Sequence, residues 1–206
     1  MLAPVTKASP ATAYVTLDSA AWTRTLFEAL LDARDRLGGE RIVVEDSERA
    51  PVSYDRLILE ATILGRKLEK LSAPGERFGV MLPNVAGLAA VFFGLQCVGR
   101  VPAMLNFSSG LKNLLAACRT TRMETMVTSR KFVEQAGLAD LIEGLQGQVH
   151  VVWTEDLRDS IGTLDKLRGA WHAKRARQRF ERRRVAPSDT AVMLFTSGSE
   201  GLPKGV

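Results

Sequence analysis

The chain has 206 residues and a formal net charge of +5, with 46% apolar and 25% charged residues. This length and composition are ordinary for a globular domain with a substantial buried core. No apolar run reaches the roughly 18 residues that cross a bilayer, and residues 1–10 contain no signal-peptide core. We therefore expect neither a membrane span nor a secretory leader.

Cysteine and histidine are sparse in this chain. Cys97 and Cys118 are lone thiols inside apolar stretches with helical spacing, and we expect both to be small, buried packing residues in a reducing cytoplasm. His150 and His172 are too few and too scattered to predict a metal site, and we name no metal ligand. We expect His150 at the edge of a strand and His172 in solvent.

The first third of the chain predicts a tether, two helices and a short strand. Residues 1–21 are rich in Ala, Thr, Ser and Pro and predict a tether. Apolar residues at helical spacing predict a helix over 22–37 that ends at Gly38-Gly39. A short strand is expected over 41–45. Ser53 is expected to cap a second helix that runs to about Leu71.

The rest of the chain alternates apolar strands with helices. The pattern predicts helices over 85–98, 111–118 and 133–145 and strands over 78–82, 101–105, 125–128, 149–153 and 191–195. Such alternation is typical of an α/β fold, in which a mostly parallel sheet is covered by helices on both faces. Ligands of these sheets bind at the carboxyl ends of the strands.

The stretch 196–206 follows the last predicted strand and has the composition of a phosphate-binding loop. Gly198 and Gly201 let the backbone approach an anion, so that amide hydrogens can point inward. Hydroxyl groups and one lysine, preceded by Pro203, add further donors. The pattern is neither a Walker A loop nor a nucleophile elbow. The candidate nucleotide-binding residues are Thr196, Ser197, Gly198, Ser199, Glu200, Gly201, Lys204 and Gly205.

The run Thr-Ser-Gly-Ser-x-Gly-x-Pro-Lys-Gly resembles the phosphate-loop signature of the adenylate-forming superfamily, which includes acyl-CoA synthetases, luciferases and peptide-synthetase adenylation domains. Most members carry Thr at the position of Glu200. With Glu at this position, the signature is similar to that of a narrower group, the acyl-[acyl-carrier-protein] synthetase half of bifunctional 2-acylglycerophosphoethanolamine acyltransferases. Stretches 25–30, 101–107 and 125–132 support the same resemblance, which covers about residues 23–206.

The resemblance implies a cytoplasmic enzyme that activates a fatty acid with ATP and Mg2+. It implies an acyl-adenylate, then a thioester on acyl carrier protein, and a link to lysophospholipid reacylation. The loop would hold the β- and γ-phosphates, Lys204 would offset their charge, and no catalytic residue is implied in this region. Residues 22–206 would be the N-terminal part of the acyl-activating domain, cut just after the loop and inactive alone. The alternatives are a long-chain acyl-CoA synthetase and a non-catalytic docking module.

Residues 171–184 predict one strongly basic helix. Its seven cationic side chains are opposed only by Glu181, so this segment accounts for the whole net charge. Three interpretations remain open: a solvated connecting helix, a docking site for acidic acyl carrier protein, or a peripheral contact with an anionic inner membrane. Nucleic acid is disfavoured, because no nucleic-acid-binding fold is recognisable. The candidate docking residues are Lys174, Arg175, Arg177, Arg179, Arg182, Arg183 and Arg184.

Overall fold

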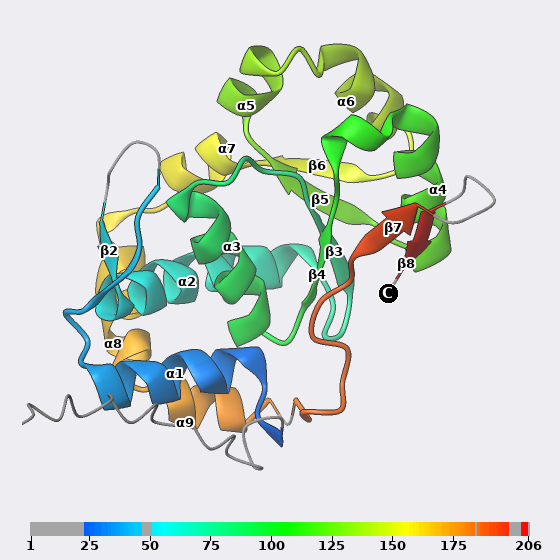
Figure 1. Ribbon diagram of the computed structural model, residues 1–206. Helices are drawn as coiled ribbons and strands as arrows, with labels where there is room; N and C mark the ends of the chain where they lie inside the picture. The colour runs from blue at the N-terminus through cyan, green and yellow to red at the C-terminus, as the bar shows by residue number, and fades with distance from the viewer. Residues whose placement is uncertain (1–22, 47–50, 184, 198–202, 206) are drawn as a thin grey trace, which may run out of the picture.

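The computed structural model describes residues 23–46, 51–183, 185–197 and 203–205. Its centre is a four-stranded parallel sheet in the order β4-β3-β5-β6 (Figure 1). The strands are β3 (Arg77–Val80), β4 (Val101–Met104), β5 (Thr125–Thr128) and β6 (His150–Trp153). All four were predicted, because each is a short apolar run bounded by glycine, proline or polar residues.

Helices cover both faces of this sheet. One layer contains α2 (Tyr54–Leu68) and α3 (Ala86–Cys97), and α7 (Thr154–Asp159) follows β6. The opposite layer contains α4 (Leu111–Thr121), α5 (Arg130–Gln135) and α6 (Ala139–Gln146) (Figure 1). Neighbouring strand residues point to opposite faces: Val127 packs in the α2–α3 core and Met126 in the α4–α6 core. The α/β fold with helices on both faces is confirmed.

An outer layer of helices packs on α2 and α3. It contains α1 (Leu26–Leu37), α8 (Thr163–Ala173) and α9 (Ala176–Glu181). Phe27 of α1 and Phe180 of α9 lie with ring centroids 5.1 Å apart, in a cluster that also contains Leu57 of α2. A small antiparallel pair, β1 (Ile42–Val44) with β2 (Val52–Ser53), links α1 to α2. The described residues also form two 3-10 turns: η2 (Glu69–Leu71) follows α2, and η3 (Phe107–Ser109) lies between β4 and α4.

Helix boundaries follow their capping residues. The first predicted helix begins at Leu26 because Thr25 forms a capping box with Glu28, and it ends at Gly38, whose φ is +91°. Ser53 caps α2 as predicted, since its hydroxyl oxygen accepts from the Arg56 backbone N–H. The predicted helix over 133–145 is two helices instead, because Gly137 adopts a φ of +63° between α5 and α6.

The predicted basic helix over 171–184 is also wrong, because the chain breaks between α8 and α9. Ala176 and Phe180 of α9 are buried in the same cluster as Phe27. His172 is buried rather than solvated, because α8 lies against α2. His150, by contrast, is exposed at the start of the edge strand β6, as predicted.

Both cysteines are packing residues, as predicted. Cys118 is buried in the α4–α6 core, and Cys97 is half-buried with its thiol 3.1 Å from the Gly94 carbonyl oxygen. Burial raises the pKa of the Cys97 thiol to about 12, which keeps it protonated and unreactive. Across the described residues, no helix combines the length and apolarity needed to span a bilayer.

Candidate functional site

The segment before the candidate loop runs along the outer side of β4. Met193 forms a parallel bridge with Ala103: its N–H donates to the Pro102 oxygen and its oxygen accepts from the Met104 N–H, both at 2.9 Å. The predicted buried strand over 191–195 is wrong, because no other residue of that segment joins the parallel sheet and Leu194 is 51% exposed. Successive side chains of an extended segment point to opposite faces, so Met193 and Phe195 turn inward while Leu194 is exposed.

Beyond this bridge, the chain leaves the sheet as a hairpin. Strand β7 (Phe195–Ser197) pairs antiparallel with β8 (Pro203–Gly205), and the hairpin lies beside α4 (Figure 1). The register places Thr196 directly opposite Lys204. Met193 and Phe195 pack against the α4–α6 core, so apolar contacts anchor the base of the hairpin. The loop therefore begins and ends on a fixed neck at the carboxyl end of β4.

The structure locates some of the candidate nucleotide-binding residues. Thr196 is exposed, and Gly205 is exposed in β8. Ser197 and Lys204 contribute backbone to the paired strands, while their side chains lie outside what the structure describes. Four further candidates lie outside the described residues: Gly198, Ser199, Glu200 and Gly201. The hairpin thus brings the two ends of the motif together, with Thr196 opposite Lys204 and Ser197 opposite Pro203.

The exits of β5 and β6 are linked to each other by polar contacts. The Ser129 hydroxyl donates to Glu155 Oε1 at 2.8 Å, and the Lys131 backbone N–H donates to the same oxygen at 3.3 Å. Burial opposes ionisation of Glu155, but these and other backbone N–H donors outweigh it and hold its pKa at about 2. Glu155 is therefore an ionised carboxylate that ties α7 to the start of α5.

A second contact joins the same two strand exits. Arg130 donates to both carboxylate oxygens of Asp156, at 2.6 and 2.8 Å, and its guanidinium lies 4.8 Å from the centroid of the Trp153 ring. Sequence reasoning missed this cluster, although the N-cap Ser129 directly after a strand is a signal that could have found it. Ser129 and Arg130, after β5, are thus bonded to Glu155 and Asp156, after β6.

The exit of β4 has its own capping group. Asn106 Oδ1 accepts from the Ser108 backbone N–H at 3.0 Å and from the Ser108 hydroxyl at 2.8 Å, which fixes η3. Phe107 packs edge-on against Phe132 of α5, with ring centroids 5.2 Å apart. The turn beside the hairpin is thus held by local contacts. Among the described residues, no cluster of three His, Cys, Asp or Glu side chains could hold a metal ion.

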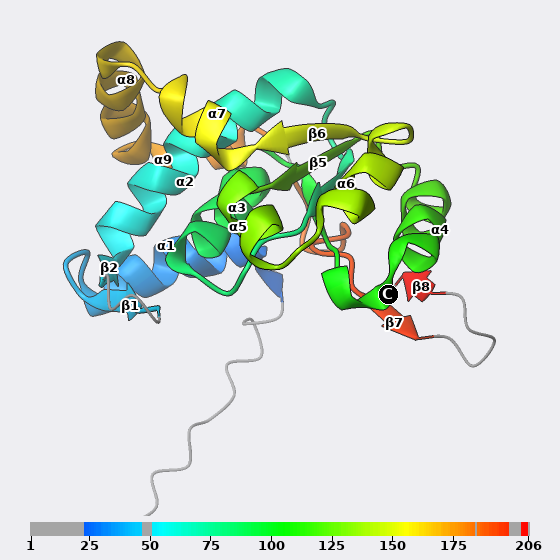
Figure 2. The ribbon, with the colours of Figure 1, turned by 90° about the horizontal axis from the view of Figure 1, so that it is seen from above.

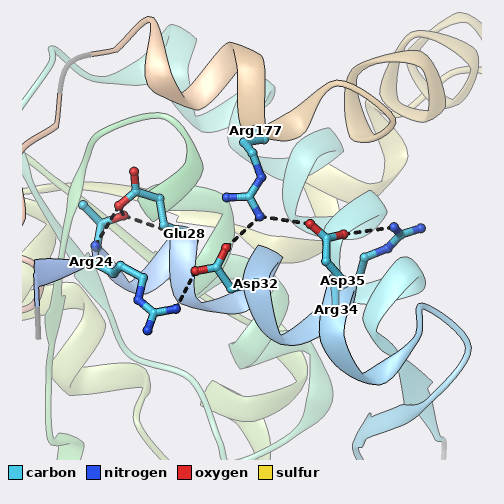
Figure 3. A network of polar contacts seen from close by, with 7 residues as sticks. Arg24, Glu28, Asp32, Arg34, Asp35 and Arg177 are labelled. Carbon is cyan, nitrogen blue, oxygen red and sulfur yellow. Dashed lines mark hydrogen bonds and ion pairs between the residues drawn. The ribbon is translucent and has the colours of Figure 1, made fainter. Parts of the chain in front are cut away.

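One cation of the basic segment, Arg177, is paired with acidic side chains of α1. Arg177 Nη2 donates to Asp32 Oδ1 at 2.8 Å and to Asp35 Oδ2 at 3.0 Å (Figure 3). Arg24 also binds Asp32, and Arg34 also binds Asp35, at 2.8 and 3.2 Å. Hydrogen bonds from Arg24 and then Arg177 lower the pKa of Asp32; those from Arg177 and then Arg34 lower that of Asp35. Arg177 therefore joins α9 to α1.

Other cations of the segment have different surroundings. Arg183 forms a 2.8 Å ion pair with Glu69, and burial together with the nearby Arg183 lowers the pKa of Arg179. Arg182 is exposed, as are Lys174 and Arg175, and Arg184 lies outside the described residues. The cations of the predicted basic helix are therefore divided between two helices and have different surroundings.

Part of the basic segment lies near the amino ends of the strands, and the hairpin that carries the candidate loop lies at their carboxyl ends. Arg182 and Arg183 line a hollow of about 720 Å³ that also includes Arg77 and Val101, the first residues of β3 and β4. The hairpin instead follows the carboxyl end of β4. The structure does not bring the two sets of predicted site residues together.

Comparisons with known proteins agree with this arrangement. A family model described as AMP-binding enzyme matches residues 31–206. The acyl-CoA ligase sidI of Beauveria bassiana (strain ARSEF 2860) is 28% identical over 156 residues, which cover 74% of this chain and 27% of that ligase. The chain therefore spans only about a quarter of this relative.

Solved structures share the fold at low sequence identity. VinN in complex with 3-methylaspartate has a TM-score of 0.68 at 22% identity, over 89% of this chain and 47% of VinN. The N-terminal domain of FACL13 from Mycobacterium tuberculosis gives 0.62 at 18%, over 89% of this chain and 44% of its own. MenE from Bacillus subtilis, in complex with AMP, gives 0.63 at 17%, over 86% and 41%. With the family model spanning most of its sequence, the chain belongs to the AMP-binding enzyme family.

Proposed function

We propose that residues 22–206 form the N-terminal part of the acyl-activating domain of an ATP-dependent, adenylate-forming acyl ligase. The observation that carries this proposal is the hairpin neck, which pairs Thr196 with Lys204 at the carboxyl end of β4. That edge of a parallel sheet is where ligands of α/β folds bind. The family match over residues 31–206 supports a nucleotide as the ligand.

In this proposal the loop between β7 and β8 holds the β- and γ-phosphates of ATP. Thr196, Ser197 and Ser199 donate hydrogen bonds, and Gly198, Gly201 and Gly205 let the backbone come close to the phosphate oxygens. Lys204 offsets negative charge as pyrophosphate leaves. Glu200 is accommodated by facing away from the phosphates or by helping to place Mg2+. The anchored neck fits this role, because a loop that positions charge needs a fixed base.

The acyl substrate in this proposal is a fatty acid, and the acceptor is the phosphopantetheine thiol of acyl carrier protein. Glu200 within the loop signature supports the carrier protein, and so does the exposed cation Arg182, which suits an acidic protein. A linked role in lysophospholipid reacylation belongs to the same proposal. Free coenzyme A is the second candidate acceptor, supported by the likeness to an acyl-CoA ligase.

The test of the loop uses the full-length protein and separates its two half-reactions. We expect Lys204→Ala to slow ATP–pyrophosphate exchange with a long-chain fatty acid by about 100-fold, the typical effect of removing one preorganised charge-stabilising group. Thioester formation from supplied acyl-adenylate should be nearly unchanged, because no triphosphate is present in that step. Lys70→Ala is the matched control, since Lys70 is an exposed lysine of η2.

Two outcomes would contradict the proposal. Equal loss in both half-reactions would argue against a phosphate role for Lys204, and absence of exchange in the unmutated protein would favour a non-catalytic docking module. The acceptor is settled separately by offering acyl carrier protein and coenzyme A in parallel and comparing the rates of thioester formation. Faster transfer to coenzyme A would replace the carrier protein in the proposal.

A further inference from the structure

One face of α8 exposes an unusual amount of apolar surface. Leu164, Leu167 and Trp171 are 67%, 64% and 50% exposed, and the two leucines are the most exposed large apolar residues among those the structure describes. Their spacing of three and then four residues places them in one stripe along the helix. In both views α8 lies at the periphery of the molecule, away from the β7–β8 hairpin (Figures 1 and 2).

The opposite face of α8 is held against α2. Asp165 forms a 2.7 Å ion pair with Lys67, and a Cβ atom on Gly169 would clash with the side chain of Ile63. His172, one turn further along, is buried. These contacts fix the rotation of α8 about its axis. The apolar stripe therefore cannot turn inward without breaking the seam with α2.

Exposed cations surround the stripe. Lys166, Arg168, Lys174 and Arg175 are all exposed, and in the part of the chain that the structure describes none of them forms an ion pair. The guanidinium of Arg175 lies 4.3 Å from the centroid of the Trp171 ring. The acidic residue of this helix, Asp165, is already paired with Lys67. The outer face of α8 is thus both apolar and strongly basic.

We propose that this face, defined by Leu164, Leu167 and Trp171 with the surrounding cations, docks the protein onto an anionic phospholipid surface. A fixed helix with leucine and tryptophan on one face and lysine or arginine around them is built to lie in the headgroup region. Its long basic side chains reach the phosphates while the apolar groups enter the acyl boundary. The indole of Trp171 suits the interface because it is apolar with one polar edge.

Two observations favour a lipid surface over an acidic protein. Exposed cations stand at several positions along and just beyond the stripe, at Lys166, Arg168 and Arg175, which matches a diffuse layer of negative charge. The cations that pair with fixed carboxylates are on other parts of the fold: Arg177 binds Asp32, and Arg183 binds Glu69. The proposed lipid contact thus shares Lys174 and Arg175 with the predicted basic segment and adds Lys166 and Arg168 of α8.

The experiment is co-sedimentation of the protein with vesicles of phosphatidylcholine, alone and with about 30–40% phosphatidylglycerol, a fraction that gives a strongly anionic surface. We expect binding to the anionic vesicles that weakens as salt rises, and little binding to neutral ones. The double variant Leu167→Ser/Trp171→Ser should lose at least about tenfold in vesicle affinity, since two buried apolar anchors are removed. Ile42→Ser is the matched control, because Ile42 is 49% exposed on β1.

A second readout reports on Trp171 directly. In a Trp22→Phe/Trp153→Phe background, brominated phosphatidylglycerol should quench the fluorescence of Trp171, because the indole would enter the acyl boundary. Failure of the unmutated protein to bind anionic vesicles would overturn the proposal. So would equal binding by the double variant, equal binding to neutral vesicles, or self-association that depends on Trp171. Thermal unfolding of each variant verifies that a loss of binding is not a loss of fold.

Discussion

Gly65 of α2 lies so close to Gly94 of α3 that a Cβ atom on Gly65 would stand 2.5 Å from the Gly94 carbonyl oxygen. The Cβ atom on Gly65 would also lie only 2.7 Å from the Cys97 sulfur. Backbone cannot move as an exposed side chain can, so the two helices would have to separate. This pair covers one face of the sheet, which makes the contact a determinant of the whole fold.

We therefore predict that Gly65→Ala lowers the free energy of unfolding by about 1–3 kcal/mol, the usual cost of overpacking a tight interior contact. Gly147→Ala is the control, because Gly147 has a φ of −76° and nothing lies within 4 Å of the point that a Cβ atom would occupy there. That variant should change stability by less than about 0.5 kcal/mol. Urea denaturation of both variants measures the difference, and equal effects would refute the close approach.

The parallel sheet was predictable from the sequence because its strands are buried on both faces. Residues 125–128 are all buried, so the run is apolar or β-branched throughout and its limits are those of β5. Helix breaks were not predictable in the same way. Hydrophobic spacing continues across Gly137, and only the left-handed backbone of that residue separates α5 from α6.

The candidate site was only partly predictable for a different reason. A motif identifies residue types, but the pairing of Thr196 with Lys204 depends on the hairpin that brings the two together. The run of basic residues predicted one strongly basic helix over 171–184. Its actual electrostatics depend on partners far away in sequence, such as Asp32, which is 145 residues from Arg177. Long-range pairing of this kind leaves no local pattern.

Charge reversal should distinguish two adjacent arginines of the basic segment. Arg183→Glu would set a second carboxylate beside Glu69, whose pKa is lowered because the Arg183 hydrogen bond and charge outweigh its burial. We predict a loss of about 1 kcal/mol for Arg183→Glu. Arg182→Glu should stay within about 0.5 kcal/mol, because Arg182 is exposed. Chemical denaturation tests this, and equal losses would contradict the pairing.

The α1–α9 ion pairs should be lost in acid. The pKa of Asp32 and that of Asp35 are lowered in the fold, so their stabilisation is present above the unfolded carboxyl pKa of about 4 and declines as the pH falls below it. Arg177→Ala removes a shared partner of both. We predict that this variant loses less stability between about pH 5 and pH 3 than the unmutated protein.

The matched control for that comparison is Arg36→Ala, because Arg36 is an exposed cation of α1, the helix that carries Asp32 and Asp35. Its acid profile should be parallel to that of the unmutated protein. Because the pairs are one-third exposed or more, the difference should also shrink in high salt. An Arg177→Ala profile that matches the Arg36→Ala profile would mean that the α1 carboxylates do not depend on Arg177.

His172 should make the outer layer sensitive to mildly acidic pH. The side chain is buried, and its Nδ1 has no hydrogen-bond partner in the part of the chain that the structure describes. Burial lowers its pKa first, and the positive charges of Arg179, Arg66 and Arg168 lower it further. The neutral imidazole is therefore the form that fits between α8 and α2.

Because the folded pKa lies below the ordinary value of 6.5, the unfolded chain binds a proton that the folded chain resists. Stability is then fully present above about pH 6.5 and falls as the pH drops from there toward the folded pKa. Only two histidines occur in the chain, and His150 is exposed. We predict that His172→Gln flattens the loss of unfolding free energy between about pH 7 and pH 5, while His150→Gln leaves it unchanged. Urea titrations across this range measure both slopes; if the two variants show the same slope, the burial of His172 does not govern the pH response.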